Sequence, residues 1–101
     1  MSEKPLFIPL RGQFFDAFKA GTKTTEYRRR GRQWTAEHCQ IGRRVILSRG
    51  YSGERLHGTV AGFHYHLLPE HLPGWVECYG HGSGDAACIM IRLDGSPAQA
   101  S

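Results

Sequence analysis

Glycine and proline divide this chain into short segments, and this spacing restricts what it can fold into. The 101 residues include 13 glycines and 5 prolines, and the apolar stretches between them suit short strands or helical turns. A chain of this size buries roughly 65% of its unfolded surface, which is enough for one small core. We therefore expect a single domain over residues 1–94, with residues 95–101 as a disordered tail.

Hydrophobic periodicity predicts mostly strands. A helix over 13–20 places three phenylalanines at helical spacing, and Gly21 is the expected left-handed cap at its end. A turn at 35–38 could form a short helix, and 67–75 is a helical turn or an ordered loop. The strands are expected at 5–10, 22–29, 45–48, 55–65 and 87–93. This pattern predicts a mainly β, α+β fold: a small, partly open β-barrel of about five or six strands with one or two short helices.

The charge is unevenly distributed. Residues 1–55 carry 12 basic and 5 acidic groups, a net charge of +7, whereas residues 56–101 carry 1 basic and 4 acidic groups, a net charge of −3. Ten of the 13 basic residues are arginine, which pairs with phosphate through two hydrogen bonds and stacks on flat rings. The first half of the chain therefore predicts an anionic partner.

Composition excludes several classes of protein. A hydrophobic fraction of 40% is too high for a disordered chain, and no apolar run approaches the ~20 residues of a membrane span. The first residues lack the apolar core of a secretory signal, so we expect a cytoplasmic protein. Cys39, Cys78 and Cys88 are expected to be free thiols. No cofactor is expected, and we assume a monomer.

The segment 21–28 carries the most informative chemistry. Lys23 follows the expected end of the helix, and period-two alternation places Glu26 and Arg28 on the same face of the next strand. Such cations bind phosphate, while the carboxylate accepts hydrogen bonds from an exocyclic amine or a ribose hydroxyl. The alternative is a network of surface ion pairs on an edge strand.

The pattern G-x-K-x-x-E-x-R, after a short aromatic helix and the sequence Leu-Phe-Ile-Pro-Leu, resembles the ASCH domain. That family belongs to the PUA-like superfamily of small β-barrels. The resemblance implies a module that binds RNA or a modified nucleoside in a cleft lined by Lys23, Glu26 and Arg28.

One enzymatic branch of the family hydrolyses the amide of N4-acetylcytidine with a Lys, a Thr and a Glu. Lys23 matches the Lys, but Glu26 occupies the position of the nucleophilic Thr. The neighbouring threonines are Thr24 and Thr25, and the candidates for the third catalytic group, the Glu, are Glu70 and Glu77. In a catalytic role, Lys23 serves as a base or oxyanion stabiliser and Glu26 as a proton shuttle or substrate anchor. The other enzymatic alternative is a metal-independent ribonuclease that uses His64 or His66.

The arginines after the motif predict a surface for the nucleic-acid backbone. They include Arg28, Arg29, Arg30, Arg32, Arg43, Arg44 and Arg49, with Tyr27, Trp34 and Tyr51 between them as possible stacking platforms. The alternatives are that Trp34 packs in the core and that the arginines serve solubility.

Histidine and cysteine could form a zinc site in the second half of the chain. The four candidate ligands are His64, His66, Cys78 and His81. Their spacing fits no standard zinc finger, and we therefore expect no bound metal.

Overall fold

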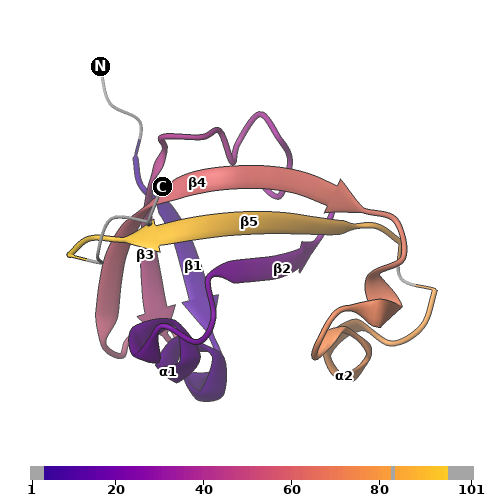
Figure 1. Cartoon of the computed structure of the whole chain (residues 1–101), viewed down its shortest axis with the longest axis horizontal. Helices are drawn as coiled ribbons and strands as arrows, with labels where there is room; N and C mark the ends of the chain where they lie inside the picture. Colours follow the sequence, from indigo (N-terminus) through magenta and orange to yellow (C-terminus); the bar gives the residue numbers. More distant parts are fainter. Residues whose placement is uncertain (1–3, 83, 96–101) are drawn as a thin grey trace.

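The part of the chain that the structure describes forms five strands and two short helices (Figure 1). The computed structural model describes residues 4–82 and 84–95. The strands are β1 (Leu6–Leu10), β2 (Thr25–Arg29), β3 (Arg44–Arg49), β4 (Arg55–His66) and β5 (Ala86–Leu93). The helices are α1 (Gly12–Ala20) and α2 (Trp75–Tyr79), and a 3-10 turn, η1, spans Pro69–His71. The predicted mainly β, α+β fold is confirmed.

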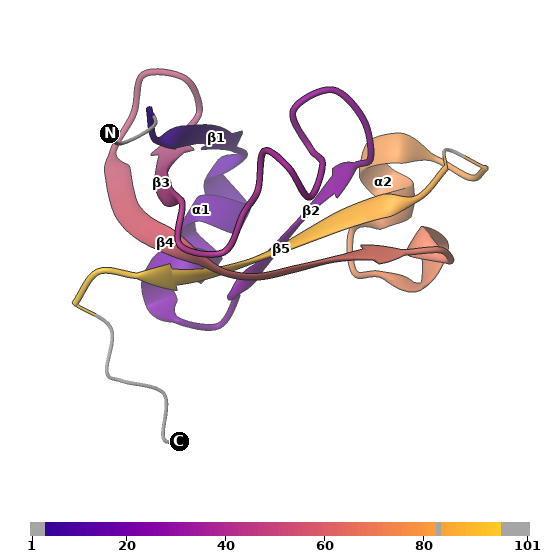
Figure 2. The same ribbon diagram turned by 90° about the horizontal axis from the view of Figure 1, so that it is seen from above.

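All five strands form one curled sheet, in the order β1-β3-β4-β5-β2. β1 runs parallel to β3, and the other neighbours are antiparallel. The two longest strands, β4 and β5, arch across the molecule, with a bulge between Val60 and Gly62 that favours curvature (Figures 1 and 2). A Cβ added at Gly62 would lie 2.7 Å from the end of the flexible Met90 side chain, which would have to move aside. The result is a half-barrel whose edge strands are β1 and β2.

The concave side of the sheet holds the main core. Helix α1 inserts Phe15 and Phe18, three positions apart on one helical face, and both are buried. They pack with buried strand residues that include Ile8, Leu47 and Ile89. A smaller cluster lies under α2 and consists of Trp75, Ala86 and Cys88, flanked by Tyr27, Leu72 and Tyr79.

Helix α1 ends where the sequence predicts. Gly21 is left-handed, with φ 83°, and its N–H donates to the Ala17 and Phe18 carbonyls. The N–H groups of Thr22 and Lys23 also donate to Ala17, at 3.0 and 3.2 Å. This cap fixes the position of Lys23 before β2 begins.

The structure differs from the predicted elements in three places. β2 begins at Thr25 rather than residue 22, because the preceding residues complete the helix cap. Residues 35–38 form turns and no helix, with Cys39 N–H bound to the Thr35 carbonyl. Helix α2 begins at Trp75, where the predicted helical turn or loop was expected to end.

The C-terminal segment and the lack of a membrane span were also predicted from the sequence. In the predicted tail, Gly95 lies in a turn after β5, and residues 96–101 lie outside the described residues. Within the described part of the chain, no helix has the length and apolar character needed to cross a membrane.

Candidate functional site

A pocket of about 240 Å³ lies where the two edges of the half-barrel approach each other. Residues at the end of β1, at the start of α1, in β2 and in α2 line it, and Figure 1 shows α1 and α2 on either side of β2. Its charged lining comprises Arg11, Lys23, Glu26 and Arg28, and its aromatic lining comprises Phe14, Tyr27, Trp75 and Tyr79. The segment singled out by the sequence therefore lines the pocket through Lys23, Glu26, Tyr27 and Arg28.

Glu26 is the centre of the charged group. Its residue is only 6% exposed, and a carboxylate in such surroundings requires ionic or hydrogen-bond partners. Glu26 Oε2 accepts a hydrogen bond from Arg28 Nε at 2.7 Å, and Glu26 Oε1 lies 3.8 Å from Lys23 Nζ. One acid therefore serves two cations, which leaves the group with a net positive charge.

Lys23 is enclosed by aromatic rings. Its ammonium lies 4.7 Å from the ring centroid of Tyr27, 5.4 Å from Phe14 and 5.6 Å from Phe18, distances at which cation–π attraction operates. Burial lowers the pKa of Lys23; Glu26 opposes this shift and the charge of Arg28 adds to it. At a given pH, more of this amine is neutral than in an exposed lysine.

Arg28 connects the two edges of the sheet. Besides its bond to Glu26, its guanidinium donates to the Pro9 carbonyl of β1 and packs over the Trp34 ring at 4.9 Å. Proline has no N–H group and suits an edge strand, since it cannot donate to a neighbouring strand. A side chain therefore bridges the strand edges at the pocket.

Helix α2 supplies the aromatic wall. Trp75 is buried, and its ring lies 4.4 Å from that of Tyr79, at an interplanar angle of 42°. Gly74 comes close to α1, because a Cβ at this residue would lie 3.5 Å from Phe14. The exposed thiol of Cys78 also lines the pocket.

Neither this wall nor the β1 side of the pocket is predicted by the sequence. The only sequence signal for the wall is the spacing of Trp75 and Tyr79, four residues apart, which places both rings on one helical face. Arg11 carries no comparable signal, because its place at the mouth of the pocket depends on the turn from β1 into α1.

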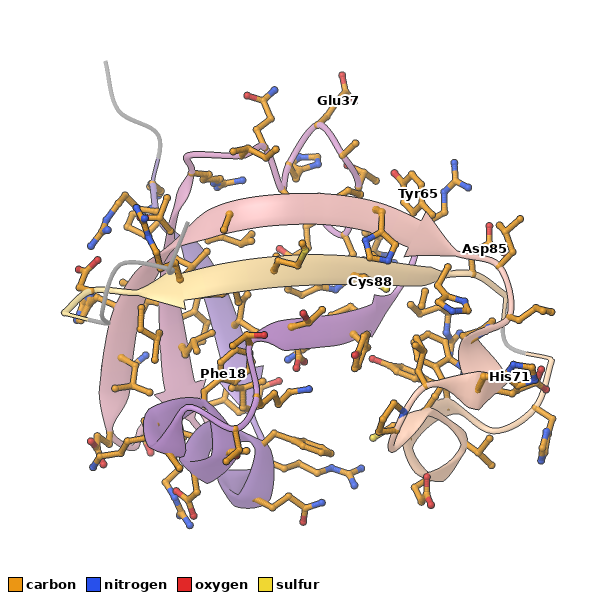
Figure 3. All side chains as sticks on the ribbon, viewed as in Figure 1. Phe18, Glu37, Tyr65, His71, Asp85 and Cys88 are labelled. Atoms are coloured by element: carbon orange, nitrogen blue, oxygen red, sulfur yellow. The ribbon has the colours of Figure 1, made fainter. Side chains whose placement is uncertain are left out.

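The other predicted arginines separate into two regions. Arg30 packs over the Tyr65 ring at 4.0 Å and pairs with Asp85 at 3.2 Å. Tyr65 and Asp85 lie at one end of the arched strands, away from Phe18 of α1 (Figure 3). Arg32 is exposed in the following turn.

Arg43 and Arg44 lie away from the pocket. Both are near the start of β3, whereas the pocket lies at the end of β1, which runs parallel to β3. Arg43 donates to the carbonyls of Lys4 and His38. Arg44 pairs with Asp94. The structure therefore does not bring these two predicted residues together with Lys23, Glu26 and Arg28.

The aromatic candidates outside the motif also separate. Tyr51 is 80% exposed in the β3–β4 connection. Trp34 is partly buried against the main core, in line with the packing alternative, while its ring also supports Arg28.

The catalytic candidates other than Lys23 and Glu26 do not line the pocket. Glu26 is the one carboxylate among the described residues that line the pocket, and no threonine lines it. Glu70 instead accepts a hydrogen bond from Gly82 N–H and contacts His81 Nδ1 at 3.0 Å. The remaining candidates Thr24, Thr25, Glu77, His64 and His66 also lie outside the pocket lining.

The predicted free thiols are confirmed for Cys39, Cys78 and Cys88. The four candidate zinc ligands are separated: Cys78 lines the pocket, His81 contacts Glu70, and His66 Nδ1 accepts a hydrogen bond from Leu68 N–H. In residues 4–82 and 84–95, no three His, Cys, Asp or Glu side chains form a group that could hold a metal ion.

Comparison with known proteins returned no match, either to a protein-family model or to a curated protein sequence.

Proposed function

We propose that this chain is an ASCH-type module that binds one nucleobase, in RNA or in a modified nucleoside, in the pocket between β1, β2 and α2. The observation that carries the proposal is the convergence of Lys23, Glu26 and Arg28 on an aromatic-walled pocket of about 240 Å³. Sites for drug-sized ligands measure about 300–1,000 Å³. A smaller pocket suits one base and its sugar rather than several bases.

The chemistry of the lining matches a nucleobase. Flat rings stack on aromatic side chains, each stacked base contributing about 1–3 kcal/mol, and Tyr79 presents a half-buried ring at the pocket. Lys23 and Arg28 can donate to carbonyl oxygens of a base, whereas Glu26 can accept from an exocyclic amine. We place this binding in the cytoplasm, by a monomer; the three free cysteines are in keeping with a reducing compartment.

Titration of the full chain with the four ribonucleosides and N4-acetylcytidine tests the proposal. Trp75 lines the pocket, so its fluorescence should change when a base stacks beside it. Lys23→Met and Glu26→Gln should each weaken binding by about tenfold or more, the loss of roughly one charge-assisted hydrogen bond.

Lys19→Met is the matched control for Lys23→Met. Lys19 is an exposed lysine in the last turn of α1, four residues before Lys23, and it pairs with Glu54; its removal should leave the affinity unchanged. Failure of every nucleoside to bind at millimolar concentration, or equal binding by the Lys23→Met and Lys19→Met variants, contradicts the proposal.

The second candidate function is a hydrolase acting on RNA or a modified nucleoside, and the lowered pKa of Lys23 favours it. A neutral amine in a pocket can accept a proton from an attacking water, and Glu26 can hold the substrate or carry that proton onward. The position of Glu26 in place of a threonine weighs against the amidohydrolase type, which requires a hydroxyl nucleophile.

Incubation of the protein at high concentration with N4-acetylcytidine and with short RNAs separates the enzyme from the binding module. Release of acetate and cytidine, or cleavage of RNA, that disappears in Lys23→Met and persists in Lys19→Met supports the hydrolase. Binding without product in the wild-type protein rejects it.

A further inference from the structure

A second hollow, of about 600 Å³, lies beside the pocket and is formed by a single stretch of chain, Arg29–Trp34. We call it the arginine hollow. It shares a wall with the pocket: Arg28 lines the pocket and packs over Trp34, which lines the hollow, at 4.9 Å. Arg29 lines the hollow and lies 5.3 Å from the ring of Tyr79, which lines the pocket. These two contacts show that the hollow adjoins the pocket.

Two cations of the hollow have no neutralising acid in the described part of the chain. Arg30 is paired with Asp85. Arg29 and Arg32 are both exposed, and neither has a carboxylate within ion-pair distance among the residues that the structure describes. The cationic surplus of the first half of the chain is thus available at this place.

The backbone holds Arg32 in an unusual conformation. Its φ of 51° is the one positive value at a non-glycine residue in the described chain, and Gly31 before it has φ 134°. Trp34 N–H donates to the Gly31 carbonyl at 2.8 Å, which closes a tight turn around Arg32. Left-handed backbone is unfavourable for a residue with a Cβ, and such outliers cluster at functional sites.

We infer that the arginine hollow binds a phosphodiester group next to the base in the pocket, so that the ligand is an RNA strand rather than a free nucleoside. The inference rests on the proposed function. Arginine is suited to this role because its planar fork donates two hydrogen bonds to phosphate oxygens. Stacking on Tyr79 also orients the Arg29 guanidinium before the ligand arrives, which lowers the entropy lost on binding.

Binding of nucleosides and of short RNAs to the full chain tests this inference. The probes are cytidine and uridine, and the hexanucleotides of the same two bases, titrated at salt concentrations from about 50 to about 200 mM. We expect the better hexanucleotide to bind at least about tenfold more tightly than its nucleoside.

The double variant Arg29→Gln/Arg32→Gln should remove that gain and leave nucleoside affinity unchanged. It should also reduce the slope of log affinity against log salt by about 0.7, the contribution of one phosphate contact to a single strand. The control Arg44→Gln/Arg49→Gln changes the net charge equally, but at two arginines that are paired with Asp94 and Asp16. It should bind the hexanucleotide within about twofold of the wild-type protein.

The variant Arg32→Gly separates a loss of RNA binding from a loss of folding. Glycine accommodates the positive φ at this residue, so the variant should melt at a higher temperature and still bind the hexanucleotide more weakly. Nucleoside binding with no gain for the hexanucleotide, or a gain that survives Arg29→Gln/Arg32→Gln, overturns the inference and leaves the proposed function standing. Absence of both nucleoside and RNA binding overturns both.

Discussion

The pocket and the opposite rim of the sheet, where Arg44 at the start of β3 meets Asp94 after β5, use the same residue types in opposite ways. At the pocket, Glu26 is buried and is shared by Lys23 and Arg28, whose side chains are 17% and 18% exposed. At the rim, Arg44 is paired with its own acid, Asp94, and both side chains are about half exposed. The first arrangement leaves an unneutralised cation in a protected place, and the second leaves none.

This difference shows why the number of arginines is a poor guide to function. Solvent and salt screen an exposed pair, which contributes little to stability or recognition. A buried carboxylate between two cations loses its hydration and depends on them. We therefore expect anion binding where cations outnumber acids and water is partly excluded. Both conditions hold at the pocket.

The largest expected effect is that of removing the shared acid. Glu26→Ala should lower the free energy of unfolding by about 3 kcal/mol, because it leaves two cations close together without their counter-ion. Urea unfolding followed by tryptophan fluorescence measures the change. Glu26→Gln is the matched variant and should lose less, because its amide oxygen can still accept from Arg28. A loss below about 1 kcal/mol for Glu26→Ala, typical of exposed pairs, removes the contrast between the two regions.

Arg28→Lys tests the bridge between the strand edges. A lysine cannot reproduce a fork that reaches both Glu26 and the Pro9 carbonyl, so we expect a loss of about 2 kcal/mol, one hydrogen bond to a charged group. The same urea titration applies. Arg44→Lys makes an identical substitution in the exposed pair with Asp94 and should cost clearly less. Equal losses for the two variants contradict the bridge.

The motif at the pocket and the long-range contacts also differ in how far they could be predicted from the sequence. Gly21, Lys23, Glu26 and Arg28 are separated by only a few residues, so local rules suffice: a glycine ends the helix, and alternation places Glu26 and Arg28 on one face. The strand and helix pattern was predicted for the same reason. The alternation did not extend to Lys23, which contacts Glu26 only because the helix cap turns the chain before β2 begins.

Contacts between distant segments could not be predicted in this way. The wall of α2 faces Lys23 across the pocket, and Asp94 neutralises Arg44 from a position 50 residues further along the chain. Both depend on the order of the strands in the sheet: β4 lies between β3 and β5 and brings Arg44 near Asp94, and β5 pairs with β2, which Lys23 precedes. No local pattern encodes that order, so a charge count along the sequence cannot separate paired from unpaired arginines.

Lys23 should give the pocket a smaller, alkaline signature. Its pKa in the folded chain is lowered from the ordinary 10.5, chiefly by burial. The unfolded chain then binds more protons than the folded chain between the two pKa values, so stability rises with pH through that window and levels off above about 10.5. At lower pH both states hold the proton, and the cost of burying the ammonium is constant.

Unfolding free energies of the wild-type and Lys23→Met proteins, measured across the alkaline range, isolate this effect. The wild-type protein should gain stability relative to the variant as pH rises toward 10.5. Tyr27, whose pKa is raised by burial, acts in the opposite sense, but its contribution is present in both proteins and largely cancels. Parallel curves show that the Lys23 ammonium is as well hydrated in the folded chain as in the unfolded chain.

The smallest effect is expected at the exposed rim, where Asp94→Asn removes the acid paired with Arg44. The hydrogen bond from Arg44 lowers the pKa of Asp94 below its ordinary 3.8, so the pair stabilises the fold above that pH and the stabilisation is lost as pH falls through the folded pKa. Thermal unfolding between neutral and acid pH should show a slight difference that decreases as NaCl screens the pair. If Asp94→Asn instead destabilises the protein at neutral pH as much as Glu26→Ala does, exposure does not separate the two regions, and the arginines at the rim become equal candidates for binding.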